Sequence, residues 1–304
     1  MTKTVIVTIA TYQRPQRLRL ALESLRLSAS SVLPALSVGV TVVDDDPNRS
    51  AREVASEFAN AFPLGCTYVF CGSHNISHAR NAGLEAALMR ADWVGSIDDD
   101  VEVPANWFRV CADALSDGKY NAVTGPLIKD FSMGPRWLTE QPFGELGLMA
   151  GTDGEASSTC ATGNNWVSST FLRRHPTLRF NPELGRTGGE DMDFFYRAID
   201  LGLRPVFSES AAVIEREPVE RCTFRYQLRR AFWLGISEAQ TNLRARRAGR
   251  ARLVARALRR AANAGARQLS SDVGRSRHCR YEVAVLVQCW GVVLGTLGVR
   301  LRHR

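Results

Sequence analysis

The chain has 304 residues, with an apolar fraction of 45% and a charged fraction of 23%, values that are ordinary for a globular protein and exclude an intrinsically disordered one. Its net charge of +8 is uneven, because residues 246–304 contain fourteen Arg and only two acids. That segment carries +12 and the first 245 residues carry −4. The overall charge is therefore no argument for nucleic-acid binding, and we expect the protein to bind no nucleic acid.

Strand and helix patterns alternate four times in the first 100 residues. Val5–Ala10 is rich in β-branched residues, and Pro15 suits the first turn of a helix that follows it. The further predicted elements of this half are strands at 39–43, 67–71 and 93–97 and helices at 51–61 and 77–89. Such alternation predicts a parallel sheet with crossover helices, in which ligands bind beyond the carboxyl ends of the strands.

The second half has a less regular pattern. Residues 129–162 are rich in Gly and lack periodicity, which is typical of a lid or a binding loop. Around this segment the sequence predicts strands at 122–128, 165–169, 204–207 and 212–214, and helices at 105–115, 191–201 and 223–245.

Acidic clusters follow two of the predicted strands. The run Trp93–Ile97 ends in Asp98, Asp99 and Asp100, and alternation along an extended chain places Asp98 and Asp100 on one side. Two carboxylates on one side can hold Mg²⁺ or Mn²⁺, whereas the alternative is a solvated acidic turn before the next helix. The cluster Asp44–Asp46 and the loop Thr11–Arg14 also lie at carboxyl ends, so all three should meet at one crevice.

The last apolar run, Val283–Val299, has only two polar residues and is flanked by arginines. Its 17 residues fall short of the roughly 20 that a transmembrane helix needs. Two interpretations remain open: a segment lying on an anionic leaflet, or a helix packed on the domain or at a dimer interface.

Taken together, the motifs of residues 4–240 resemble those of family 2 glycosyltransferases, which are inverting enzymes with a GT-A fold. The resemblance rests on motifs that occur in the expected order: Thr11-Tyr12-Gln13-Arg14-Pro15, Val43-Asp44-Asp45-Asp46-Pro47-Asn48, His78-Ala79-Arg80-Asn81-Ala82-Gly83, Ile97-Asp98-Asp99-Asp100, Thr162-Gly163-Asn164-Asn165 and Gly189-Glu190-Asp191-Met192-Asp193. It implies an α/β fold with a Rossmann-like, mostly parallel sheet flanked by helices. We expect this GT-A catalytic domain over residues 1–245, with a nucleotide-binding half of about 1–103 and an acceptor half of about 104–245. A basic, helical C-terminal extension would then occupy residues 246–304.

The same resemblance implies a set of site residues. It assigns the metal to Asp100, with Asp98 contacting the ribose or the metal, and the nucleotide base to Asp45, with Asp44 as the fallback. Arg80 would meet the uracil edge or the diphosphate, unless it is a surface residue that pairs with Glu85 or Asp92. The full predicted nucleotide-sugar-binding set is Thr11, Tyr12, Arg14, Asp45, Arg80, Asp98, Asp99 and Asn164.

An inverting transfer needs a general base to accept the proton of the acceptor hydroxyl. The resemblance supplies it from the pair Glu190-Asp191, with Asp191 as the base and Glu190 as an acceptor-positioning group. The alternative is ordinary capping of a helix N-terminus by acids, which does not explain the preceding Gly188-Gly189.

The chain departs from the family pattern in two ways. Residues 213–218 contain no His where many relatives have one, which leaves Glu215 as a replacement or implies weaker metal binding. There is also no Gln-x-x-Arg-Trp motif, so addition of a single sugar is favoured over processive synthesis of a polymer.

We therefore expect a hexosyltransferase-type enzyme with a nucleotide-sugar donor, UDP-type favoured, and a saccharide or lipid-linked acceptor in cell-envelope or exopolysaccharide synthesis. The rivals are a metal-dependent nucleotidyltransferase and a non-catalytic nucleotide- or saccharide-binding protein. Seven cysteines without a CxxC pair, and an N-terminus unlike a signal peptide, favour the cytoplasm, with residues 246–304 as a peripheral contact to the inner face of the membrane.

Overall fold

The computed structural model describes residues 2–147, 151–270 and 279–299. The chain divides into two compact units, which are described separately. The sheet unit comprises residues 1–128, 149–186 and 190–215, and the helical unit comprises residues 129–148, 187–189 and 216–304. The division predicted at residue 245 differs from this one, because helix α8 (Phe224–Arg244) groups with the two helices that follow it.

The sheet unit contains most of the secondary structure. Its strands are β1 (Lys3–Thr11), β2 (Leu36–Asp44), β3 (Cys66–Phe70), β4 (Trp93–Ile97), β5 (Val101–Glu102), β6 (Ala122–Thr124), β8 (Asn164–Ser168) and β9 (Pro205–Phe207), and β7 (Leu127–Asp130) and β10 (Val213–Arg216) cross the boundary between the units. Its α-helices are α1 (Pro15–Ser30), α2 (Arg52–Glu57), α3 (Ile76–Leu88), α4 (Trp107–Ala114), α6 (Ser169–Arg174) and α7 (Glu190–Asp200).

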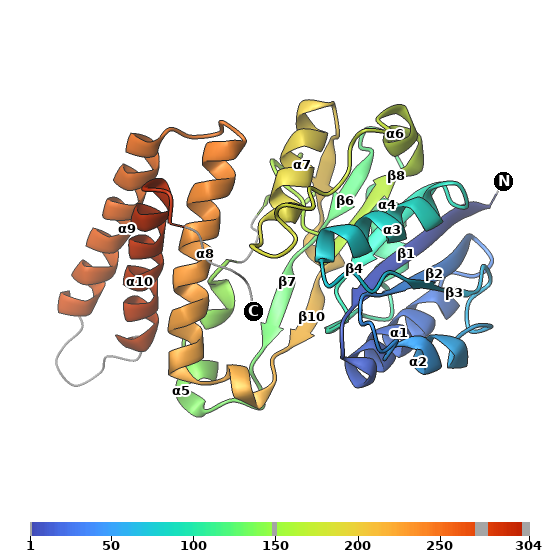
Figure 1. Ribbon diagram of the computed structural model, residues 1–304, viewed down its shortest axis with the longest axis horizontal. Coiled ribbons are helices and arrows are strands. Elements are labelled where there is room, and N and C mark those ends of the chain that lie inside the picture. Colours follow the sequence, from blue (N-terminus) through green and yellow to red (C-terminus); the bar gives the residue numbers. More distant parts are fainter. Residues whose placement is uncertain (1, 148–150, 271–278, 300–304) are drawn as a thin grey trace. The chain divides into compact units, whose positions relative to one another are not determined.

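The main sheet confirms the predicted α/β class. Its seven strands have the order β3-β2-β1-β4-β8-β6-β9 (Figure 1). The four strands from the first 100 residues are parallel, whereas β8 is antiparallel to both of its neighbours, β4 and β6. The acids after β2 and β4 and the loop after β1 therefore follow the carboxyl ends of neighbouring parallel strands, as predicted.

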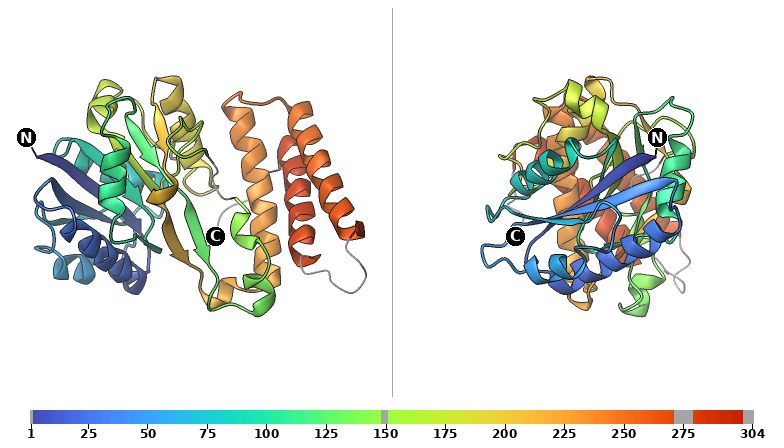
Figure 2. Two further views of the ribbon diagram at one scale, coloured as in Figure 1. Left: turned by 180° about the vertical axis from the view of Figure 1, so that it is seen from behind. Right: turned by 90° about the vertical axis from the view of Figure 1, so that its right-hand side faces the viewer.

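Two apolar cores cover the two faces of this sheet. Alternation along β1 sends Val5, Val7 and Ile9 into one core, which also contains side chains of α1, α2 and α4. Ile6 belongs to the other core, with side chains of α3, α6 and α7. Figures 1 and 2 show α3 on one face of the sheet and α1 and α4 on the other.

One predicted strand is wrong in its extent. The run Ala122–Ile128 forms two strands, because the chain leaves the main sheet at Gly125 and enters a second sheet with the order β5-β10-β7. A side chain at Gly125 would lie 2.7 Å from the carbonyl oxygen of Ala211, so this close approach requires glycine. Strand β5 and helix α6 were not predicted, because both are short and carry no periodic signal.

The helical unit contains α5 (Arg136–Thr139), α8 (Phe224–Arg244), α9 (Arg250–Ser270) and α10 (Cys279–Thr296). The hydroxyl of Thr223 caps α8 by accepting the amide hydrogen of Tyr226. Helix α10 packs against both α8 and α9, and the three share an apolar core. In the part of the chain that the structure describes, no helix has the length and apolar character needed to cross a membrane.

Candidate active site

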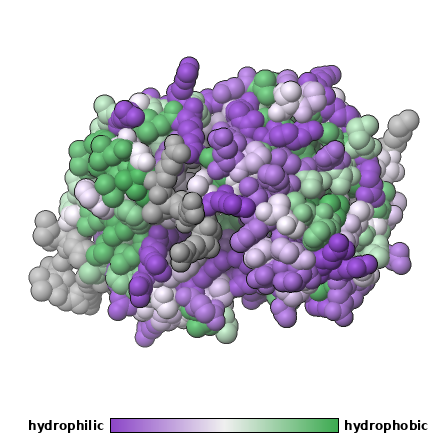
Figure 3. Space-filling model, in the orientation of Figure 1, coloured by the Kyte–Doolittle hydropathy of each residue, from purple (hydrophilic) through white to green (hydrophobic). Residues whose placement is uncertain are grey.

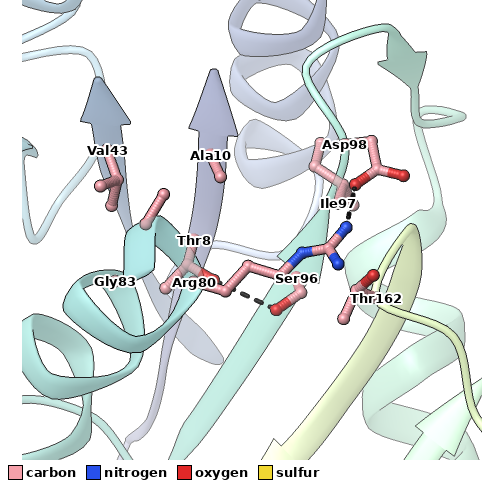
Figure 4. A pocket seen from close by; sticks show the side chains of 10 residues that line it. Thr8, Ala10, Val43, Arg80, Gly83, Ser96, Ile97, Asp98 and Thr162 are labelled. Atoms are coloured by element: carbon pink, nitrogen blue, oxygen red, sulfur yellow. Dashed lines mark hydrogen bonds and ion pairs between the residues drawn. The ribbon is translucent and has the colours of Figure 1, made fainter. Parts of the chain in front are cut away.

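A small, open hollow lies at the carboxyl end of β1 and β4 in the sheet unit. Strand β1 contributes Thr8 and Ala10, which alternation places on the face covered by α3. The loop after β4 contributes Asp98, α3 contributes Arg80, and Thr162 closes the opposite side (Figure 4). The hollow therefore lies where the sequence predicted ligand binding.

Arg80 links two of the predicted acids across this hollow. Its guanidinium donates to Asp98 Oδ1 over 3.1 Å and also to the carboxylate of Glu190 (Figure 4 shows the first of these contacts). Burial opposes the charge of Arg80, but the nearby carboxylates of Glu190, Asp98 and Asp191 outweigh it and raise the pKa. Arg80 is thus a mostly buried residue of the site, and it forms ion pairs with Asp98 and Glu190 rather than with the predicted alternatives Glu85 or Asp92.

The three acids after β4 have different surroundings. The side chain of Asp98 is 39% exposed, whereas those of Asp99 and Asp100 are 6% and 7% exposed. Asp100 accepts hydrogen bonds from Arg14 over 3.1 Å and from Arg17 over 3.2 Å. Of the predicted metal pair, Asp98 is therefore the carboxylate that faces the hollow, and Asp100 is engaged with arginines.

Asp99 lies between a cation and a neighbouring acid. It accepts hydrogen bonds from the hydroxyl of Thr11 over 2.8 Å and from Arg14 over 3.0 Å. Burial and the charge of Asp100 raise the pKa of Asp99 to about 6, although Arg14 and Thr11 favour its ionised form. Thr11 and Arg14 thus hold the acidic loop, and the first turn of α1 adds Arg17, which sequence reasoning missed although its spacing from Arg14 places both on one helix face.

The acidic loop partly fits a divalent cation. No group of three or more His, Cys, Asp or Glu side chains could hold an ion within residues 2–147, 151–270 and 279–299. A single exposed carboxylate, Asp98, suits an ion that takes its other ligands from water and from a substrate diphosphate.

The acids at the carboxyl end of β2 organise the neighbouring loops. Asp45 is buried and accepts hydrogen bonds from the backbone amides of Ser73 and Asn75, over 2.7 Å and 2.6 Å, and from the hydroxyl of Ser73. Asp44 is fully buried and accepts from the amides of Asp46 and Ala51 and from the Tyr68 hydroxyl. Asp45 therefore shapes the loop before α3 whether or not it also meets a ligand.

An aromatic pair lies beside that loop. The rings of Tyr12 and His74 are stacked, with centroids 4.7 Å apart and planes within 2°. His74 also has a positive φ of 50°, which is uncommon for a residue other than glycine. The contact between Tyr12 and His74 was not predicted, because nothing in their spacing along the chain indicates it.

The pair Glu190-Asp191 begins helix α7, as predicted. Glu190 is buried. Its burial and the negative charge of Asp191 raise its pKa, whereas the positive charge of Arg80 acts in the opposite direction. Asp191 is half-buried and accepts the amide hydrogen of Met192 over 2.7 Å. Of the two acids, Asp191 is thus the one that a bound molecule can reach more easily.

The two glycines before this pair belong to the helical unit. Both have a positive φ, 83° for Gly188 and 85° for Gly189, which disfavours any other residue. A side chain at Gly188 would lie 2.4 Å from the ring of Trp233, and one at Gly189 would lie 3.0 Å from Thr241 Oγ1. Helix α8 therefore packs closely against the backbone that leads into Glu190, and leaves no room for side chains at these two positions.

One predicted binding residue lies in the core. Asn164 is buried, its amide donates to the carbonyls of Pro126 and Ala211, and its oxygen accepts from the Trp107 indole. These three bonds tie β8 to its surroundings. Its polar atoms are therefore used by the fold, and we do not assign it a ligand.

The amino-acid sequence matches the family described as Glycosyl transferase family 2 over residues 6–181. It is 30% identical over 230 residues to the succinoglycan biosynthesis protein ExoM of Rhizobium meliloti, which covers 75% of this chain and 71% of that protein.

Solved structures show the same fold at lower sequence identity. A mannosyltransferase from Pyrobaculum calidifontis, in complex with GDP-Man and Mn²⁺, has a TM-score of 0.63 at 19% identity, covering 98% of this chain and 88% of the other. S. aureus TarS in complex with UDP-GlcNAc has a TM-score of 0.56 at 13% identity, with coverages of 98% and 91%. In a longer TarS structure the chain spans 43% of the other protein's length. With the sheet order and the site described above, these matches show that the chain is a GT-A-fold glycosyltransferase that belongs to glycosyl transferase family 2.

Proposed function

We propose that the enzyme transfers one sugar, with inversion, from a nucleoside diphosphate sugar to a saccharide or lipid-linked acceptor. The observation that supports this most strongly is the bridge of Arg80 between Asp98 and Glu190. It joins the acid at the carboxyl end of β4 to the helix that begins with Glu190-Asp191, so a donor-binding group and a candidate base belong to one connected site.

The chemical step that we propose requires two changes at the sugar. The acceptor oxygen attacks the anomeric carbon while the bond from that carbon to the diphosphate oxygen breaks, and the electron pair leaves with the diphosphate. Asp191 accepts the proton of the acceptor hydroxyl, because it is more accessible than Glu190, which is buried against Arg80. Attack on the face opposite the leaving group inverts the anomeric configuration.

The leaving diphosphate gains negative charge, which the site must stabilise. Asp98 would hold a divalent cation, Mg²⁺ or Mn²⁺, which would neutralise part of this charge when bound. Arg80 lies beside Asp98 and keeps that carboxylate oriented toward the hollow. Asp45 and Tyr12 lie further along the carboxyl edge, and we assign them to the nucleoside.

The donor and acceptor classes rest on the comparisons and the sequence. A UDP-type donor is favoured, and the relative named for succinoglycan biosynthesis supports an acceptor in exopolysaccharide or cell-envelope synthesis. Because the chain has no Gln-x-x-Arg-Trp motif, we propose addition of a single sugar rather than a polymer.

The proposal is tested with a panel of nucleotide sugars in a thermal-shift assay with and without Mn²⁺, because stabilisation tracks ligand affinity. We expect one UDP-sugar to raise the melting temperature, and more so with Mn²⁺. The anomeric configuration of the product from the stabilising donor is then determined by NMR and is expected to be inverted. A retained configuration, or stabilisation by nucleoside triphosphates alone, would contradict the proposal and favour a nucleotidyltransferase.

A further inference from the structure

Helix α10 turns large apolar side chains outward. Leu286 is 40% exposed, Trp290 is 59% exposed, and Leu297, directly after the helix, is 75% exposed. Their spacing of four and seven residues places them on one side of the helix. The residues beside them, Val283, Val287, Val293 and Leu294, are half-buried, so all seven side chains of this outward face are apolar.

The opposite side of α10 carries its small residues. Ala284, Gly291 and Gly295 are buried, and a side chain at Gly291 would lie 2.3 Å from the carbonyl oxygen of Phe232 in α8. At Gly295 it would lie 2.8 Å from Ala239 Cβ. The close contact with α8 thus uses small residues, while a helix packed in water would normally direct its large apolar side chains inward.

The helical unit also has strong positive charge. Residues 246–304 contain fourteen Arg, and their two acids are Asp272, which lies outside the described residues, and Glu282. Glu282 is buried and paired with Arg267. Helix α9, which packs against α10, exposes Arg252, Arg256 and Arg259 together with Leu258. Figure 3 shows hydrophobic residues gathered over α9 and α10, with hydrophilic residues at the border.

We propose that the outward face of α10 docks on an anionic lipid surface and lies in the plane of the headgroups. Apolar side chains would enter the boundary between headgroups and acyl chains, where tryptophan is favoured, and the arginines of α9 would meet the negative headgroups. A second copy of this chain fits less well, because it would bring a segment with the same charge of +12. The proposal goes beyond the sugar transfer and does not depend on it.

The test is co-flotation of the full-length protein with vesicles of phosphatidylcholine alone or mixed with phosphatidylglycerol. We expect flotation with the anionic vesicles and less of it at high salt. The double variant Leu286→Gln, Trp290→Gln should weaken binding about tenfold or more, because it removes two apolar contacts. The matched control is Leu20→Gln, Leu27→Gln on α1, whose side chains are 53% and 51% exposed and which should leave flotation unchanged.

Trp290→Phe keeps an apolar ring, so this variant should still float but should lose the part of the fluorescence that brominated lipids quench in the wild-type protein. That readout remains informative if the double variant fails to fold. The proposal is overturned if brominated lipids quench the wild-type protein and Trp290→Phe equally, or if the folded double variant floats like the wild type. It is also overturned if the wild-type protein does not float with anionic vesicles. If that protein instead forms a dimer that the double variant dissociates, the outward face of α10 binds a second copy of the chain and not a lipid surface.

Discussion

Three arginines offset the mutual repulsion of the three adjacent carboxylates after β4. Arg80 contacts Asp98, Arg14 contacts Asp99 and Asp100, and Arg17 contacts Asp100. Arg14 directly precedes α1, Arg17 lies in its first turn and Arg80 lies in α3, so segments on opposite faces of the sheet contribute to one acidic loop. This distribution leaves Asp98 as the acid that faces the hollow.

The pKa of Asp99 leads to a prediction about stability. Its carboxyl group has a pKa of about 6 in the folded protein and an ordinary value of 3.8, so between these values the folded state holds the proton more tightly. Ionised Asp99 therefore costs stability, and the wild-type protein should lose roughly 1–3 kcal/mol relative to Asp99→Asn as the pH rises from about 4 to about 7.5. Urea unfolding of both proteins at several pH values measures this difference. A difference that stays constant with pH would show that Asp99 has an ordinary pKa.

The surroundings of Asp98 and Asp100 predict different effects of neutralising each acid. Asp98→Asn should remove the Mn²⁺-dependent part of the thermal shift that UDP produces, because it removes the exposed carboxylate. Asp100→Asn should keep that part and instead lower the unfolding free energy by roughly 1–3 kcal/mol, since Arg14 and Arg17 lose a buried partner. The opposite pattern would restore Asp100 as the metal ligand.

At the scale of elements, the N-terminus of α7 depends on a close contact within the helical unit. Gly188 combines a positive φ with a position against Trp233, so its backbone is restricted by conformation and by space. We therefore expect Trp233 to position the segment that leads into Glu190-Asp191, since a side chain added at Gly188 would lie 2.4 Å from its ring.

Substitution of Gly188 tests this role. Gly202 offers a matched control, because its φ is 97° and an added side chain would meet nothing within 4 Å. Gly202→Ala should cost about 1 kcal/mol of stability through backbone strain alone. Gly188→Ala should cost more and lower kcat by about tenfold or more with little change in donor affinity, because a small misplacement of a catalytic group is costly.

The double variant Gly188→Ala, Trp233→Ala completes the comparison. Removal of the indole makes room for the added methyl group, so Gly188→Ala should cost less stability in the Trp233→Ala background than in the wild-type protein. Equal effects of Gly188→Ala and Gly202→Ala on stability and kcat would mean that Trp233 does not position this segment.

At the scale of the whole molecule, the parallel half of the sheet and the meeting of its acidic loops beside a hollow were predictable. Short β-rich runs alternate with helix patterns there, and each acidic cluster directly follows a strand, so local patterns and a general rule of α/β sheets were sufficient. The order of the motifs from Thr11 to Asp193 predicted the family, which the sequence match over residues 6–181 confirms.

What could not be predicted depends on contacts between distant residues. Three contacts join residues that are 57 to 83 positions apart and meet only after folding. They are the pairing of Arg17 with Asp100, the hydrogen bond of Trp107 to the buried Asn164, and the stacking of Tyr12 on His74. The end of the strand at Gly125 follows from the approach of Ala211. The grouping of α8 with α10 likewise follows from close packing at Gly235, which has no counterpart in the apolar periodicity.

We propose that Asp191 acts as the general base of the transfer. The alternative is that the acids of α7 only stabilise its N-terminus, and Asp193 provides the control, because it lies in the same first turn and pairs with Arg197. The measurement compares kcat and donor affinity for Asp191→Asn, Asp193→Asn and the wild-type enzyme.

We predict that Asp191→Asn lowers kcat by ~10²–10⁴-fold and leaves donor affinity nearly unchanged, which is the range expected when a general base is lost. Asp193→Asn should change both quantities little. If the two variants lose activity equally, or if Asp191→Asn abolishes donor binding while bound donor still turns over at the normal rate, Asp191 is not the base.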